Sequence, residues 1–185
     1  MGRPLRAQAA GEIFHLTARG VRRGPVYLDD LDYQLYLRLL GQTTRRFEWQ
    51  VLAYCLMPNH VHLLVRVLEP TLSAGMHRQQ GLYARRYNER HNYSGHVFEA
   101  RFHSVHVTRE EQLFLTLRYL ALNPPQAGLC VDPADWPWSS HAVLAGRSRD
   151  WSPLHVLSIR ELFGAGHQWL ARYARFIDGP AAAEP

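Results

Sequence analysis

Hydrophobic and polar residues alternate along positions 12 to 19, where the chain runs Glu-Ile-Phe-His-Leu-Thr-Ala-Arg before Gly20. A period of two with β-branched and aromatic residues predicts a strand. The period then changes, because leucines at positions 31, 35, 39 and 40 have the spacing of a helix with one buried face. Asp29 and Asp30 can cap this helix, which we expect to end at about Phe47.

The following segments predict a hairpin and then further elements. We expect a strand from Trp49 to Leu56, a tight turn at Met57-Pro58-Asn59 and an antiparallel strand from His60 to Val67. The remaining elements are a helix from Thr71 or Ser73 to about Arg90, an extended segment from Val97 to Val107, and a helix that begins at a capping box of Thr108 and Glu111 and ends before Asn123-Pro124-Pro125.

This order, βαββαβ followed by one further helix, is typical of an α+β protein with a ferredoxin-like sandwich, in which helices pack on one face of an antiparallel sheet. Neither repeats nor low-complexity linkers divide the chain. We expect an N-terminal tail at 1–10, one catalytic domain at 11–146 and a C-terminal extension at 147–185. A last helix is expected from Gly166 to Ile177, and the final residues are expected to be frayed.

The amino-acid composition indicates a globular protein and the kind of partner that it binds. The chain has 185 residues, of which 46% are hydrophobic and 20% charged, as in an ordinary globular protein. It has neither an apolar stretch long enough to cross a membrane nor the apolar stretch of a signal peptide, so we expect a cytoplasmic protein. Cys55 and Cys130 are expected to be reduced. The net charge of +5 favours an anionic partner, and all 21 basic residues are arginine, a good phosphate ligand. Codon bias in a GC-rich genome explains the absence of lysine better.

Two histidines open the second strand of the hairpin. Residues two apart on a strand point to one face, so the imidazoles of His60 and His62 should converge while Val61 points to the other face. A pair of this kind binds a metal ion or simply faces solvent, and the spacing alone favours solvent.

The third helix offers a partner for the histidines. Tyr119 and Asn123 lie four residues apart and therefore share a helix face. The amide oxygen of Asn123 is a hard ligand suited to Mg²⁺ or Mn²⁺. Spacing alone favours a core or interface role for Tyr119 and a helix-capping role for Asn123.

Several motifs in order resemble the single-tyrosine HUH transposases (IS200-like transposases), and particularly their REP-associated tyrosine transposase branch. The matching segments are His15 to Gly20, Leu56 to Val65 with the sequence Leu-Met-Pro-Asn-His-Val-His-Leu-Leu-Val, Gly95 to Phe102, Arg118 to Pro124 and Trp136 to Ser140. The resemblance covers about residues 11 to 146.

The resemblance implies an activity. It identifies Tyr119 as the nucleophile, carried on the helix that follows the sandwich, and His60, His62 and Asn123 as ligands of a divalent metal, Mg or Mn. Tyr119 would become linked to the 5′-phosphate of single-stranded DNA next to a hairpin, and strand transfer would be the reverse attack. The family includes dimers, whereas the REP-associated branch is more self-contained, so a monomer or a homodimer is expected.

Arginines would follow the DNA backbone in such a protein. The candidates are Arg19, Arg22, Arg23, Arg78, Arg85, Arg86, Arg90 and Arg101. A solvated helix face is the alternative for those on the second helix. His15, His96, His103 and His106 are expected to be structural or to face DNA.

Two other functions compete with a tyrosine transposase. One is a DNA-binding regulator, derived from a transposase, that binds hairpins without cutting them. The other is a metal-dependent hydrolase that uses bound water. Only the tyrosine enzyme should leave DNA covalently attached to the protein.

Overall fold

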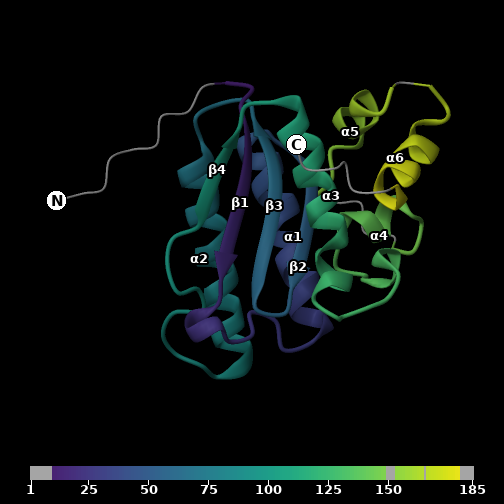
Figure 1. Ribbon diagram of the computed structural model, residues 1–185. Helices are drawn as coiled ribbons and strands as arrows, with labels where there is room; N and C mark the ends of the chain where they lie inside the picture. The colour runs from purple at the N-terminus through teal and green to yellow at the C-terminus, as the bar shows by residue number, and fades with distance from the viewer. Residues whose placement is uncertain (1–9, 149–152, 165, 180–185) are drawn as a thin grey trace.

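The computed structural model of the chain describes residues 10–148, 153–164 and 166–179. Its centre is a four-stranded antiparallel sheet in the order β2-β3-β1-β4 (Figure 1). The strands are β1 (Ile13–Arg19), β2 (Trp49–Met57), β3 (His60–Val67) and β4 (His103–Val107). The expected α+β fold with an antiparallel sheet is therefore confirmed.

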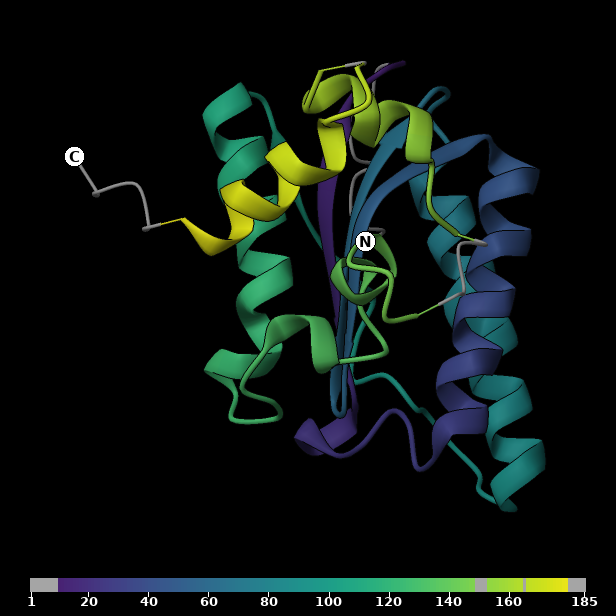
Figure 2. The same ribbon diagram turned by 90° about the vertical axis from the view of Figure 1, so that its right-hand side faces the viewer.

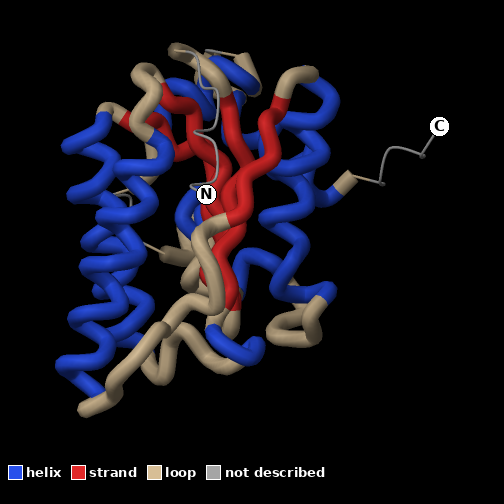
Figure 3. Tube along the Cα trace, turned by 90° about the vertical axis from the view of Figure 1, so that its left-hand side faces the viewer, coloured by secondary structure: helices blue, strands red, loops and turns tan. Residues whose placement is uncertain are grey.

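Helices cover both faces of this sheet. The two helices between the strands, α1 (Asp30–Phe47) and α2 (Leu72–His91), lie side by side on one face. The helix that follows β4, α3 (Glu110–Gln126), lies on the opposite face together with α6 (Trp169–Asp178), as the edge-on view in Figure 2 shows. Figure 3 shows the same layers from the other edge. The face toward α3 is the one that Figure 1 presents to the viewer.

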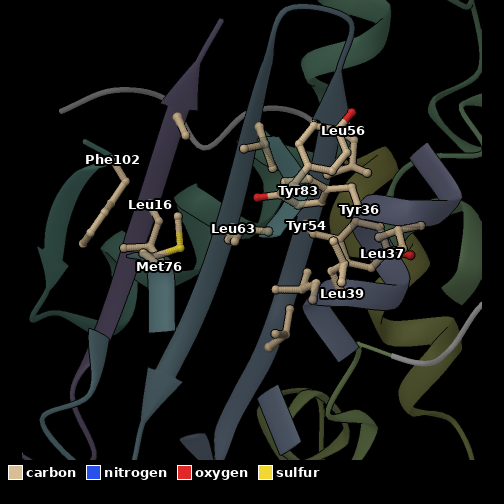
Figure 4. Packing of buried hydrophobic residues seen from close by; sticks show 14 of the residues in the cluster. Leu16, Tyr36, Leu37, Leu39, Tyr54, Leu56, Leu63, Met76, Tyr83 and Phe102 are labelled. Atoms are coloured by element: carbon tan, nitrogen blue, oxygen red, sulfur yellow. The ribbon is translucent and has the colours of Figure 1, made fainter. Parts of the chain in front are cut away.

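The larger core lies between the sheet and the α1–α2 pair. Leu16 of β1 and Leu63 of β3 point into it and are completely buried. Three tyrosines, Tyr36, Tyr54 and Tyr83, fill its centre (Figure 4). Side chains alternate along a strand. The neighbours of these leucines in sequence therefore point to the other face, toward α3.

A second core lies between the sheet and α3. Leu113 and Leu117 of α3 pack there with Leu64 of β3, and the C-terminal helices contribute Ile159 and Tyr173. These helices are α5 (Val156–Leu162) and α6, and the short α4 (Ser140–Leu144) also borders β2. The described parts of the predicted C-terminal extension are thus packed against the domain.

Some predicted boundaries are wrong. Of the segment Val97–Val107 only β4 is a strand, and the residues before it form a loop that meets the sheet through one bridge, between Gly20 and Phe98. The residue that precedes α3 is Arg109, without a side-chain cap, and the backbone N–H of Thr108 donates to Gln112, so the capping box with Glu111 is not formed.

The predicted ends of two helices also differ. Helix α3 continues through Pro124 and Pro125 to Gln126, because proline φ angles suit a helix and the N–H of Ala127 closes the last turn on the Asn123 and Pro124 carbonyls. The last helix spans Trp169–Asp178 instead of starting at Gly166. Helices α4 and α5, and the short 3₁₀ turns η1 (Val21–Arg23) and η2 (Pro133–Asp135), were not predicted.

Other expectations concern the cysteines, the membrane and the ends of the chain. Cys55 and Cys130 are free thiols, as expected. No helix in the described ranges combines the length and the apolar character that crossing a membrane requires. Residues 1–9 of the predicted tail and the predicted frayed end from residue 180 lie outside the described residues.

Candidate functional site

The histidine pair follows the tight turn of the β2–β3 hairpin. Only Pro58 and Asn59 separate the two strands, so His60 is the first residue of β3. Val61 lies between the histidines in sequence and packs into the larger core with 1% of its surface exposed. His60 and His62 consequently point toward the α3 face, where their ring centroids lie 4.8 Å apart in an edge arrangement. The predicted convergence of the two imidazoles is confirmed.

Helix α3 brings Tyr119 to these histidines. The phenol ring meets the His62 ring edge to face, with centroids 5.4 Å apart, and its centroid lies 6.2 Å from that of His15 on β1. Leu117 and Leu120 anchor the helix in the second core, so Tyr119 sits beside that core with 44% of its surface exposed. The tyrosine is therefore at once packed on the histidines and open to a large ligand.

Asn123 lies one helical turn beyond Tyr119 and is buried, with 8% of its surface exposed. Its backbone carbonyl accepts from the N–H of Ala127, at 3.0 Å, within the last turn of α3. Asn123 thus belongs to the same helix end as Tyr119.

The histidines are neutral at neutral pH. Burial, followed by repulsion from Arg19, lowers the pKa of His60 to about 4. Burial, followed by His60, His15 and Arg19, lowers the pKa of His62 to about 3. The pKa of His15 is also lowered, by burial and then by His103. A neutral imidazole carries a lone pair, which is what a metal ligand needs.

The hydrogen bonds of the histidines involve their Nδ1 atoms. Nδ1 of His60 lies 2.6 Å from Oδ1 of Asn59. Nδ1 of His62 lies 3.0 Å from Nε2 of His15 and 3.3 Å from Oγ1 of Thr17. Nε2 of His62 is buried and has no hydrogen-bond partner within the described part of the chain.

A buried nitrogen without a partner is a cost that a bound ion would remove. The histidine pair therefore fits a metal ion. Within the described ranges, no group of three or more His, Cys, Asp or Glu residues could hold a metal. Any ion at this pair needs further ligands of another kind, such as an amide oxygen or a phosphate.

Two predicted DNA-binding arginines lie beside the histidines. Arg19 ends β1 opposite His60. Together with Arg101 it lines an open hollow of about 350 Å³, which also includes Thr17 and His103. Because Thr17 contacts His62 as well, this hollow adjoins the histidine pair.

Arg22 and Arg23 form an exposed turn attached to the hairpin. Both adopt left-handed backbone angles, with φ of 55° and 59°, which cost energy in residues other than glycine. Backbone hydrogen bonds from Gly20 to the Asn59 carbonyl, at 2.9 Å, and from Val26 to the Pro58 carbonyl, at 2.8 Å, fasten this turn beside the histidines.

The four candidate arginines of α2 lie elsewhere. Helix α2 packs on the opposite face of the sheet from the histidines (Figure 2). Arg85 and Arg86 are exposed and pair weakly with Glu89. Arg90 is held at α1 by Asp29, at 2.5 Å, and by the buried Asp32, at 2.7 Å. Arg78 is only partly exposed. The structure does not bring these arginines to the histidine site.

Sequence reasoning missed two residues of the site. His15 was expected to be structural or to face DNA, and Asn59 was expected only to form the turn. The alternation of side chains along β1 could have indicated His15, because residues two apart on a strand share a face and His15 therefore points to the same side as Thr17 and Arg19. The hydrogen bond of Asn59 has no such signal, since it depends on the rotamer of one side chain.

Comparisons with known proteins identify a family and one relative. The profile of the family described as "Transposase IS200 like" matches residues 11–122. A protein of Haemophilus influenzae assigned as a REP-associated tyrosine transposase is 27% identical over 111 residues, which is 54% of this chain and 62% of that protein. This chain thus spans about three fifths of that relative.

A solved structure has a similar fold. It is described as a REP-associated tyrosine transposase bound to a REP hairpin, and it superposes with a TM-score of 0.66 at 18% identity. The match covers 80% of this chain and 87% of the solved one. At this identity the likeness concerns the fold.

Proposed function

The chain belongs to the IS200-like transposase family, and on that premise we propose that it is a metal-dependent enzyme that nicks and rejoins single-stranded DNA next to DNA hairpins. The observation that carries the proposal is the contact between Tyr119 and His62. The ring centroid of the half-exposed phenol lies 5.4 Å from that of the His62 imidazole, whose Nε2 is buried without a partner among the described residues. This contact supports a site in which Tyr119 would act as the nucleophile beside a pair of metal ligands.

His60 and His62 would hold the metal through their neutral rings, and Asn123 would complete the ligand set from α3. When bound, Mg²⁺ or Mn²⁺ supplies charge stabilisation to a phosphodiester under attack. The protein would contribute in two ways: it keeps both imidazoles uncharged and it holds Tyr119 beside them. Uncharged rings matter because a protonated imidazole would repel the metal ion and weaken its binding.

Tyr119 would attack phosphorus through its phenol oxygen. The new bond joins that oxygen to the 5′-phosphate, and the bond from phosphorus to the 3′-oxygen of the preceding nucleotide breaks. The phenol proton passes to solvent, which the exposed ring allows, and the released 3′-oxygen takes up a proton, so charge and atoms balance. Attack by a DNA 3′-hydroxyl on the tyrosine–DNA bond would reverse these steps and transfer the strand.

The DNA substrate would be bound near the histidines through its phosphate groups. The similar solved structure is described as bound to a REP hairpin, and we extend a hairpin with single-stranded flanks to this chain. Arg19, Arg22, Arg23 and Arg101 surround the histidine end of the sheet and would bind the backbone near the cut. Arg85 and Arg86 would contact only DNA that passes the α2 face, and Arg90 is already occupied by two aspartates.

Covalent trapping tests this proposal. A labelled single-stranded hairpin oligonucleotide is incubated with the protein and Mn²⁺, and the mixture is denatured. The wild type should carry DNA and Tyr119→Phe should not, because only one oxygen has been removed. Tyr93→Phe is a matched control, since Tyr93 is 59% exposed and its ring packs against Tyr87 and His91 at the end of α2 instead of against the His60–His62 pair.

The outcomes separate the rival functions. An adduct that survives Tyr119→Phe, or that maps to another tyrosine, would overturn the assignment. Cleavage without an adduct would identify a hydrolase that uses water, and tight hairpin binding without cleavage would identify a regulator. His60→Ala and His62→Ala should abolish cleavage while leaving hairpin binding largely intact, because the arginines provide most of the affinity.

A further inference from the structure

The histidine pair raises a question of proton placement. A neutral imidazole carries one hydrogen, on Nδ1 or on Nε2, and only the other nitrogen has a lone pair for a metal. The hydrogen bond made by one nitrogen determines which tautomer is present. Both histidines bond through Nδ1 in this structure, to residues outside the proposed ligand set.

For His60 the partner is Asn59. The Nδ2 group of Asn59 donates to the backbone carbonyl of Arg23 at 3.2 Å. A carbonyl can only accept, so this bond fixes the orientation of the amide and turns its oxygen toward His60. That oxygen also can only accept, and it lies 2.6 Å from Nδ1 of His60. The hydrogen of His60 must therefore be on Nδ1.

For His62 the partner is His15, assisted by Thr17. The Nδ1 atom of His62 lies 3.0 Å from Nε2 of His15, and the two rings are stacked with centroids 5.1 Å apart. Two arrangements of hydrogens satisfy this contact. In one, His15 donates, which leaves His62 with a buried Nε2–H that has no acceptor among the described residues. In the other, His62 donates and its Nε2 keeps a lone pair.

A buried N–H without an acceptor is rare and costly. A buried lone pair without a donor is also costly, but a bound cation removes that cost, whereas a cation cannot satisfy an N–H. The second arrangement is therefore favoured, with His15 as the acceptor.

We propose that Asn59 and His15 are positioning residues that hold His60 and His62 in the Nδ1–H tautomer, so that both Nε2 lone pairs are available to one divalent ion. This inference rests on the proposed function at His62, where the ion favours one of the two arrangements, whereas the hydrogen of His60 follows from the hydrogen bonds of Asn59 alone. It also gives Asn59 a second role: it ties the Arg22–Arg23 turn to the metal-binding form of His60.

The first test reads the tautomers directly. Long-range ¹H–¹⁵N correlation spectra of the metal-free protein at neutral pH distinguish Nδ1–H from Nε2–H histidines. We expect Nδ1–H for both His60 and His62. Asn59→Ala should shift His60 toward a mixture of tautomers, and His15→Phe should do so for His62 while keeping an aromatic ring against Tyr119.

Conservative variants should rescue the tautomers. Asn59→Asp and His15→Gln each retain an oxygen that accepts, so the Nδ1–H form should persist in both. His77→Gln is a matched control, because His77 is exposed on α2 and contacts neither histidine. Circular dichroism identifies any variant that loses its fold, and the conclusion then rests on the conservative pair.

The second test measures binding of Mn²⁺ alone, from the electron paramagnetic resonance signal of the free ion. Loss of such a supporting hydrogen bond typically weakens metal affinity about 10–100-fold, and we expect this for Asn59→Ala and His15→Phe but not for His77→Gln. Nε2–H histidines in the wild type, or tautomers that both disruptive variants leave unchanged, would overturn the proposal. Nδ1–H histidines that respond as expected but bind no Mn²⁺ would support the positioning roles and count against the proposed metal.

Discussion

Gly75 on α2 provides a sharp test of how the helix pair packs on the sheet. A Cβ added at this position would overlap the indole of Trp49, with Cε2 at 2.9 Å and two other ring carbons closer still. The indole cannot simply slide away, because Trp49 is 4% exposed and its Nε1 donates to Oγ1 of Thr71 at 3.0 Å. Gly75→Ala must therefore move the indole or the helix.

Three contributions determine the size of the effect. Overpacking of a filled core costs about 1–3 kcal/mol. Losing the Trp49–Thr71 hydrogen bond costs about 1 kcal/mol more. Alanine in a helix interior recovers about 1 kcal/mol relative to glycine. The free energy of unfolding should fall by about 2 kcal/mol, and the melting temperature by roughly 4–8 °C for a chain of this size.

Gly81 on the same helix is the control, because an added Cβ would meet nothing within 4 Å. Gly81→Ala should raise the free energy of unfolding by about 0.5–1 kcal/mol. Urea unfolding followed by circular dichroism at 222 nm gives both values, provided that the denaturant dependence is unchanged. Equal stability of the two variants would refute the close packing of Gly75 on the indole of Trp49.

Three further predictions address other parts of the molecule. Replacing Arg22 and Arg23 by glycine relieves two left-handed residues, so it should stabilise the fold by about 0.5–1 kcal/mol in thermal melts while weakening hairpin binding and lowering its salt dependence in fluorescence anisotropy. Tyr83→Phe removes a 2.5 Å hydrogen bond to a buried backbone carbonyl and should cost about 1–3 kcal/mol in urea unfolding. The hydrogen bond from Arg90 lowers the pKa of Asp29 below its ordinary value of 3.8. The ionised Asp29 therefore stabilises the fold above pH 3.8, and this stabilisation is lost as the pH falls through the folded pKa. In acid titrations of the free energy of unfolding, Arg90→Gln should lack this loss.

The main strands and helices could be predicted because each element carries its own period, whereas the sequence pattern placed the helices on one face of the sheet and the structure has them on both. The first strand was expected at 12 to 19 and spans Ile13–Arg19, and both strands of the hairpin end within one residue of their expected positions. An alternating strand must bury its hydrophobic face, and a continuous hydrophobic strand must be covered on both faces, so both patterns identify a strand and its place in the sheet. The same alternation predicted that His60 and His62 share a face.

The buried face of α1 was predicted less well. Leu31 was expected to point into the core but is 56% exposed, and Tyr33 and Tyr36 are buried instead. Tyrosine occurs both in cores and at surfaces, so its place is not evident from sequence. Here the tyrosine rings pack on one another, with Tyr27 and Tyr33 stacked at 4.2 Å. That aromatic cluster forms only when separate elements meet.

The candidate site likewise has features that the sequence predicts and features that only the fold determines. The sequence by itself determined that two imidazoles point in one direction and that Tyr119 and Asn123 share one helix face, because both follow from local periodicity. Only the tertiary structure decided that α3 lies on the histidine side of the sheet, that His15 and Asn59 bond to the two Nδ1 atoms, and that the α2 arginines lie on the far side. These relations join residues up to about a hundred positions apart, and they depend on which faces the two cores bury, which no local pattern records.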